Sequence, residues 1–157
     1  MASRATIGDV IEIPTPKGLA YAQFTHNDPQ WGQLLRVLPG FFEKRPSDLS
    51  ELVEKDEVFV SFFPLQAALR KKIFGVVENH PVPEDAEDFP LFRATGWRDK
   101  SGKVLDWWLW NGKRSWQIEG QLTPEQKKLP IQEVINDTLL IERIEQGWTP
   151  ETDKWSQ

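Results

Sequence analysis

Residues 7–25 read IGDVIEIPTPKGLAYAQFT and contain the sequence pattern of a complete β-hairpin. Residues 7–14 are rich in β-branched side chains and end at Pro14, which is typical of a strand. The next four residues, Thr-Pro-Lys-Gly, favour a tight turn because proline presets the first corner and glycine can take positive φ. In residues 19–25, Ala20, Ala22 and Phe24 alternate with larger or polar side chains. The stretch therefore predicts two antiparallel strands.

The chain on the C-terminal side continues the same pattern. A turn at 26–29 precedes a third predicted strand at 32–40, which ends at Pro39-Gly40. Short strands joined by tight turns predict a strongly curled antiparallel sheet, and an SH3-like barrel at the N-terminus is one way for such a sheet to close.

The remaining chain adds strands first and helices last. Residues 46–55 predict a helical turn with Ser47 or Asp48 as its N-cap, and 65–72 fit either a helical turn or an irregular strand. A capping-box pattern begins at Thr123, and Asp137 is a candidate N-cap for a last helix that ends at Gly147. Further strands are expected at 57–65, 72–83, 91–99, 103–110 and 113–120.

The fold class that follows is α+β: mostly antiparallel sheet with short C-terminal helices. We expect one domain over residues 1–157, with an ordered core at about 7–148 and a loose tail at 149–157.

Composition narrows the possible functions. The chain of 157 residues has a net charge of −5 and contains no cysteine, which excludes disulfides and thiolate chemistry. An acidic chain is a poor general binder of nucleic acid, which needs clustered lysine and arginine. No signal peptide or membrane-spanning run is visible, so we expect a cytoplasmic protein that contacts no membrane.

Residues 106–116, DWWLWNGKRSW, hold four of the eight tryptophans around one Asn-Gly pair. A two-residue type I′ turn at Asn-Gly would place Trp107 opposite Trp116 on an apolar face, where both rings would be structural. Trp108 and Trp110 lie on the other face among polar residues. Either the C-terminal helices cover these two rings, or the rings form an exposed patch that binds a partner. Stacking on single-stranded nucleic acid is disfavoured, since only Lys113 accompanies them.

The most acidic stretch is a proline-bounded loop at 83–90. It is either a solvated connection or a display of negative charge for a cationic partner. Its four carboxylates belong to Glu84, Asp85, Glu87 and Asp88.

The sequence contains little that indicates catalysis. His26 and His80 each lie in a turn next to proline, without the HxH or HExxH spacing of a metal site, and no nucleotide or nucleophile motif is present. We therefore predict no catalytic, metal or cofactor-binding residues. The alternative is a small hydrolase or metal-dependent enzyme that uses His26, His80 and scattered carboxylates.

Several short segments together resemble the immunity protein 26 family, whose members are found beside toxins in bacterial polymorphic toxin systems. The resemblance implies a cytosolic, mostly β, non-enzymatic protein that binds and neutralises a cognate toxin. It supplies no catalytic motif and no toxin-contacting residues. The segments are 7–14, 20–24, 34–38, 65–83, 108–112 and 141–148, which together span most of the chain.

The resulting hypothesis is a binding protein that occludes a basic toxin without cofactors or catalysis. The expected partner contacts are the four carboxylates of residues 84–88 together with Trp108 and Trp110. Opposite charge on the two proteins would speed their encounter.

Overall fold

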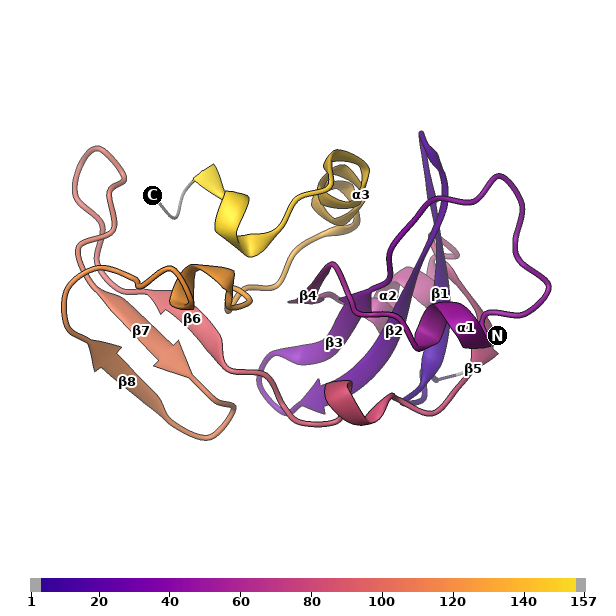
Figure 1. Cartoon of the computed structure of the whole chain (residues 1–157), viewed down its shortest axis with the longest axis horizontal. Coiled ribbons are helices and arrows are strands. Elements are labelled where there is room, and N and C mark those ends of the chain that lie inside the picture. The colour runs from indigo at the N-terminus through magenta and orange to yellow at the C-terminus, as the bar shows by residue number, and fades with distance from the viewer. Residues whose placement is uncertain (1–3, 155–157) are drawn as a thin grey trace. The chain divides into compact units, whose positions relative to one another are not determined.

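The computed structural model describes residues 4–154, and Figure 1 traces the course of the chain. These residues form two compact units, one made of residues up to 88 together with 133–147, the other of 89–132 and the residues from 148 onward. The single domain expected over residues 1–157 remains a prediction, which this division into two units does not test. No helix in the described part of the chain combines the length and apolar character needed to cross a membrane.

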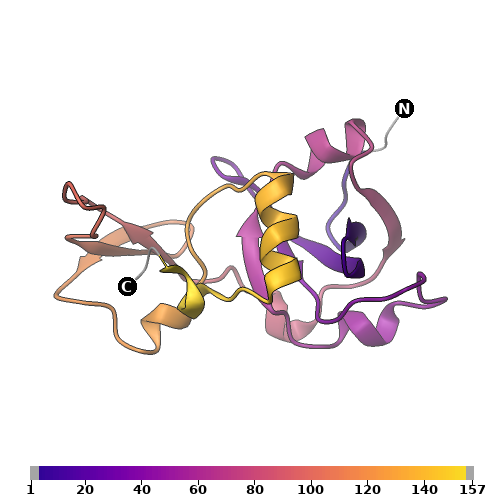
Figure 2. The same ribbon diagram turned by 90° about the horizontal axis from the view of Figure 1, so that it is seen from above.

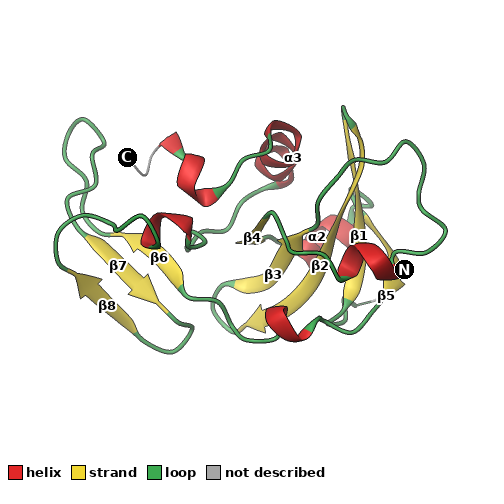
Figure 3. Ribbon diagram, in the orientation of Figure 1, coloured by secondary structure: helices red, strands yellow, loops and turns green. Residues whose placement is uncertain are grey.

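The first unit is built on a five-stranded antiparallel sheet in the order β4-β3-β2-β1-β5 (Figure 3). Thr15 at the end of β1 pairs with Gly18 at the start of β2, which confirms the hairpin predicted over 7–25. The strands are β1 (Asp9–Thr15), β2 (Gly18–Asp28), β3 (Gly32–Val37), β4 (Phe59–Phe62) and β5 (Gly75–Asn79).

The sheet is open and not strongly curled, so the expected curled sheet and SH3-like barrel are wrong. Closure would require β4 to pair with β5, but these strands lie at opposite ends of the strand order. The outer edge of β4 is already used: Phe62 forms a parallel bridge with Val134, and the Ile135 amide donates to the Phe62 carbonyl at 3.1 Å. The coarser expectation of a mostly antiparallel α+β fold is confirmed.

Three short α-helices belong to this unit: α1 (Ser50–Val53), α2 (Leu65–Arg70) and α3 (Asp137–Gln146). The helical turn expected within 46–55 is present, and of residues 65–72, left open between a helical turn and a strand, 65–70 form the helix α2. The N-cap of α3 is Asn136 and not Asp137, since the Asn136 side chain accepts the Leu139 amide at 2.8 Å. Gly147 ends α3 in the left-handed conformation, as predicted. Figure 2 shows α3 beside the sheet, where it contacts β1.

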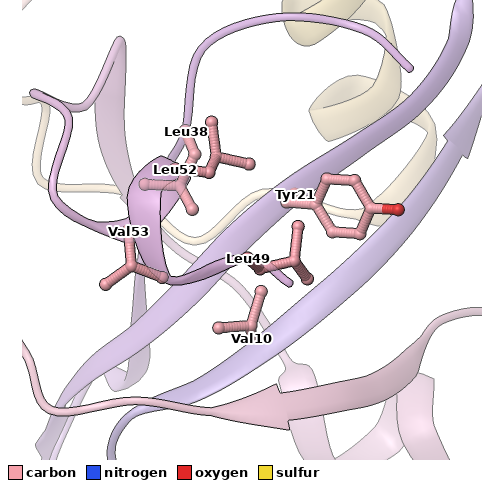
Figure 4. Packing of buried hydrophobic residues seen from close by; sticks show 6 residues of the cluster. All are labelled: Val10, Tyr21, Leu38, Leu49, Leu52 and Val53. Atoms are coloured by element: carbon pink, nitrogen blue, oxygen red, sulfur yellow. The ribbon is translucent and has the colours of Figure 1, made fainter. Parts of the chain in front are cut away.

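The side chains around α1 form a hydrophobic cluster with two strands of the sheet (Figure 4). Leu49 has no exposed surface and lies between Val10 of β1 and the ring of Tyr21 from β2. The cluster consists of Val10, Tyr21, Leu38, Leu49, Leu52 and Val53.

Arg36 of β3 is buried at 2% exposure, yet it has several polar partners. Its guanidinium donates from Nη1 to Gln23 Oε1 at 2.8 Å and to the Val53 carbonyl at 3.0 Å. From Nη2 it donates to the Lys55 carbonyl at 2.6 Å. Burial lowers the pKa of Arg36, and the nearby Glu57 carboxylate opposes that change. The charge therefore satisfies the carbonyl groups at the C-terminal end of α1 and holds them against the sheet.

Gln23 also bonds to the backbone just before β1 and just after β5. Its amide nitrogen Nε2 donates to the backbone carbonyls of His80 at 2.8 Å and Gly8 at 3.3 Å. Gly8 has φ +98°, and a Cβ there would lie 2.5 Å from the His80 oxygen, so glycine is required for this approach.

The second unit contains a three-stranded antiparallel sheet in the order β6-β7-β8. Thr123 and Gln126 exchange reciprocal hydrogen bonds at 2.9 and 3.1 Å, as the capping-box pattern predicts, but only a 3₁₀ turn follows. The strands are β6 (Phe92–Thr95), β7 (Trp107–Trp110) and β8 (Ser115–Ile118).

The described part of the C-terminal tail contains a short helical turn, and the looseness expected over 149–157 stays a prediction. Pro150–Thr152 form a 3₁₀ turn, and Arg93 Nη2 donates a hydrogen bond to the Pro150 carbonyl. Pro150 and Asp153 are buried. The prediction for 155–157 lies outside the described residues.

The β7–β8 hairpin differs in register from the two-residue turn predicted at Asn111-Gly112. Trp107 pairs with Ile118, and Trp116 pairs with Leu109, so the predicted Trp107–Trp116 pair is wrong. The reason is the Asn111 side chain, whose oxygen accepts the amides of residues 113 and 114 at 3.0 and 2.9 Å and closes a longer loop. A type I′ turn would need positive φ at Asn111; among the described residues, the one non-glycine with positive φ is Lys72.

The shift is by two residues, so each side chain keeps its predicted face. Trp107 is buried at 4%, as expected of a structural ring, and the guanidinium carbon of Arg93 lies 5.7 Å from its ring centroid. Trp116 is 37% exposed, so its expected burial is wrong. Trp116 therefore contributes less to the packing than Trp107.

We predict that Trp107→Ala lowers the free energy of unfolding by about 3–5 kcal/mol, because it empties a packed site and removes the ring facing Arg93. Trp116→Ala on the same face should cost about 1 kcal/mol or less. Urea unfolding followed by far-ultraviolet circular dichroism measures both changes. Equal losses from the two substitutions would contradict the difference in packing.

A second prediction concerns pH. Arg45 donates to both oxygens of Glu12 at 2.6 and 3.0 Å, and this bond is the main cause that holds the pKa of Glu12 below its ordinary value. The Tyr21 hydroxyl also donates to Glu12 at 2.9 Å. A pKa lowered by folding adds stability above the unfolded pKa, and that stability is lost as the pH falls through the folded pKa.

Glu12→Gln should therefore be less stable than the unchanged chain at about pH 7, and the difference should vanish near about pH 2. Glu43→Gln, at an exposed position without a described ion pair, is the control and should show little difference at either pH. The measurement is urea unfolding across this pH range. A deficit of Glu12→Gln that persists undiminished in acid would contradict the ion-pair explanation.

Candidate functional site

The acidic loop, defined as residues 84–88, begins with the 3₁₀ turn η1 (Glu84–Ala86). The side chains of all four acidic residues, Glu84, Asp85, Glu87 and Asp88, are exposed. None of the four forms an ion pair with another described residue. The loop therefore presents a concentration of negative charge that no neighbouring cation neutralises.

His26 of β2 holds the end of the acidic loop. Its ring nitrogen Nε2 lies 2.7 Å from the Glu87 carbonyl oxygen, and Nδ1 lies 2.9 Å from the Thr25 hydroxyl oxygen. Because a carbonyl can only accept, Nε2 carries the proton in this arrangement. The imidazole thus acts as a clamp between the sheet and the loop, a role that the sequence pattern did not predict.

Trp110 is buried at 8%, so it does not belong to an exposed patch. The rings of Phe89 and Phe92 pack against it, with centroids 5.4 and 5.2 Å from that of Trp110. Gly112 permits this packing, because a Cβ at that position would lie 2.8 Å from the Phe89 ring.

Trp108 is partly exposed, and its indole nitrogen donates to Asp106 Oδ2 at 2.8 Å. Asp106 also accepts the Trp97 amide. A Cβ on Gly96 would overlap the Asp106 carboxylate, so glycine makes room for this side chain. Trp108 is therefore a partly exposed ring that a hydrogen bond to Asp106 orients.

Two large apolar side chains that the sequence pattern did not single out are more exposed than Trp108. Trp97 is 79% exposed and Leu105 is 60% exposed. They are neighbours across the extension of the β6–β7 hairpin, where the Leu105 amide donates to the Trp97 carbonyl at 2.7 Å. Strand alternation could not show their exposure, because β6 ends at Thr95, before Trp97, and β7 begins at Trp107, after Leu105.

The acidic loop belongs to the first unit, whereas Trp108 and Trp110 belong to the second. The sequence hypothesis treated them as possible parts of one contact surface. Of the predicted contact residues, the four acidic ones of the loop are all exposed.

The two histidines have different partners. His80 Nε2 donates to Glu78 Oε1 at 2.6 Å, and Asp48 completes a group whose potential ligand atoms lie within 4.8 Å of one another. Hydrogen bonds from Ser50 are the main cause that lowers the pKa of Asp48. His26 is not a member of this group, which contains one histidine, and the enzyme alternative stays a prediction.

An open hollow of about 640 Å³ lies between β1, β5 and the end of α2. Its lining includes Asp9 and Glu12, but both carboxylates already have partners within the fold. Asp9 accepts the Thr6 amide at 2.8 Å and an Asn79 amide hydrogen at 2.9 Å, and Glu12 is bound by Arg45. These two groups stabilise the wall of the hollow.

Comparison with protein-family models, with characterised proteins and with solved structures gave no match.

Removal of the His26 clamp should loosen the acidic loop. His26→Phe keeps an aromatic ring but removes both nitrogens, and the loss of about one net hydrogen bond predicts 3- to 10-fold faster amide exchange at Ala86 and Glu87. The Val53 amide, which donates to the Leu49 carbonyl at 3.0 Å elsewhere in the unit, is the internal control. Unchanged exchange at residues 86 and 87 would show that His26 does not hold the loop.

Proposed function

We propose that this chain is a bacterial immunity protein that binds a cognate toxin in the cytoplasm and neutralises it by occlusion. The protein covers a functional surface of the toxin and carries out no chemical step on it. The proposal draws on the resemblance of residues such as 7–14 and 65–83 to the immunity protein 26 family.

The observation that carries the proposal is the acidic loop. Four exposed carboxylates occur within five residues and lack ion pairs with the described residues, while the His26–Glu87 contact fixes the backbone that bears them. A fixed loop loses little conformational freedom on binding, which favours affinity. Its charge favours a basic partner and accelerates the encounter.

The aromatic part of the proposed contact is revised. Trp110 is covered by Phe89 and Phe92 and is left out, whereas Trp108 is partly exposed. Trp97 and Leu105 supply the larger exposed apolar area in that unit. Tryptophan is enriched at binding hot spots, so these side chains are second candidates for contact with the toxin.

The non-catalytic part of the proposal is supported by the environment of His26. Both ring nitrogens are within hydrogen-bond distance of groups of the fold, Thr25 and the Glu87 carbonyl. The imidazole thus has a positioning role near the C-terminal end of β2, a strand that continues through the turn expected at His26.

The test uses the toxin encoded beside this chain. We expect it to co-purify with the chain, and we expect the association rate to fall about 10-fold or more when the acidic loop is neutralised as Glu84→Gln, Asp85→Asn, Glu87→Gln and Asp88→Asn. The dependence of that rate on salt should also become weaker, since fewer charges act at long range. Stopped-flow fluorescence at several salt concentrations measures both effects.

The control variant carries four substitutions that remove the same amount of charge elsewhere: Glu43→Gln, Glu51→Gln, Glu119→Gln and Glu125→Gln, all at exposed positions. Both variants change the net charge of −5 by four units, so a difference between them reports the position of the charge. Equal association rates for the two variants would remove the acidic loop from the proposal. Failure of the unchanged chain to bind the toxin would contradict the immunity function itself.

A further inference from the structure

Asp48, Glu78 and His80 bring one imidazole and two carboxylates together on the first unit. Glu78 and His80 belong to or follow β5, whereas Asp48 precedes α1. Their potential ligand atoms all lie within 4.8 Å of one another. Donors around a tetrahedral zinc ion are about 3.4 Å apart, given bonds of about 2.0–2.1 Å, so small side-chain movements would close the group around an ion.

The backbone that carries these donors is fixed by buried contacts. The His80 carbonyl accepts from the buried Gln23 at 2.8 Å, and the His80 amide donates to the Gly8 carbonyl at 3.1 Å. Asp48 precedes Leu49, which is fully buried in the cluster of Figure 4. The Leu49 amide in turn donates to Glu78 Oε1 at 3.2 Å and joins the two segments.

The carboxylates also have partners that orient them. Ser50 donates to Asp48 from its amide at 3.0 Å and from its hydroxyl at 2.9 Å. Outer hydrogen bonds of this kind fix the direction of metal ligands and raise metal affinity. The exposed Asp48 remains accessible to an ion that arrives from solvent.

A hydrogen bond joins the side chains of His80 and Glu78. The Nε2–H group donates to Glu78 Oε1 at 2.6 Å, and both side chains are about one quarter exposed. For a metal ion to bind at Nε2, that proton must leave this nitrogen, either to solvent from a doubly protonated ring or by a shift to Nδ1 of the neutral ring, because the metal takes the lone pair of a neutral imidazole. The same two atoms would then be bridged by the ion.

We propose that Asp48, Glu78 and His80 form a binding site for a divalent transition-metal ion of the Zn²⁺ type. Imidazole nitrogen with carboxylate oxygen suits zinc, whereas Mg²⁺ and Ca²⁺ prefer oxygen ligands alone. Three protein ligands leave a fourth position for water or for a group from another molecule. The site is independent of the proposed binding of a toxin.

The chain offers a matched control, because it contains only two histidines and no cysteine. His80→Gln removes the imidazole of the proposed site, and His26→Gln removes the other imidazole. The full chain is freed of metal with a chelator and titrated with zinc chloride, manganese chloride or magnesium chloride in a calorimeter. A rise in melting temperature with zinc is the second readout.

We expect one zinc ion per chain, weaker binding of Mn²⁺ and no binding of Mg²⁺. His80→Gln should weaken zinc binding by more than about 10-fold, and His26→Gln should bind as the unchanged chain does. Nuclear magnetic resonance should show that zinc moves the imidazole signals of His80 and leaves those of His26 in place. Asp48→Asn, a conservative change at an exposed side chain, should also weaken zinc binding and serves if His80→Gln fails to fold.

Three results would overturn the proposal. One is the absence of zinc binding to the unchanged chain at concentrations up to roughly millimolar, which is well above the dissociation constant of a built site. Another is zinc binding that survives both His80→Gln and Asp48→Asn. The third is an effect of zinc on the His26 signals instead of those of His80.

Discussion

The buried guanidinium of Arg36 is the interaction on which the first unit depends. At 2% exposure it bonds to Gln23 and to the carbonyls of Val53 and Lys55, so it joins β2 and β3 to the end of α1. A buried charge is tolerated only when such partners satisfy it, and removal of one partner leaves the others unpaired at a high cost in free energy. The sheet and α1 are therefore held in one relative position by polar bonds as well as by apolar packing.

The same strand, β2, also fixes both ends of the segment that bears the negative charge. Gln23 holds the His80 carbonyl where the segment leaves β5, and His26 holds the Glu87 carbonyl in the acidic loop. The proline-containing chain between these two anchors is thus tied to a rigid element at each side. This arrangement explains how an exposed, self-repelling loop can keep a defined backbone, which is the property that a preformed binding surface needs.

Local patterns predicted the local structure well. Tight-turn chemistry located the β1–β2 hairpin, and Gly147 ended α3 as expected of a C-cap. The acidic loop could also be found from composition alone. Patterns could not show contacts between distant residues: the Phe89 ring that covers Trp110, the clamp from His26, or the polar partners of Arg36. The predicted register of the β7–β8 hairpin is wrong for a local reason. An Asn side chain, that of Asn111, competes with the backbone for the amides of the turn.

Occlusion and enzymatic inactivation predict different stoichiometries, so a titration of toxin activity separates them most directly. Purified toxin is mixed with increasing amounts of the chain, and residual toxin activity is measured together with the mass of the recovered toxin. Occlusion predicts a linear fall in activity that ends near about one chain per toxin molecule, with toxin of unchanged mass. Complete inactivation by far less than one chain per toxin, or a covalent change in the toxin, would contradict occlusion and would indicate an enzyme.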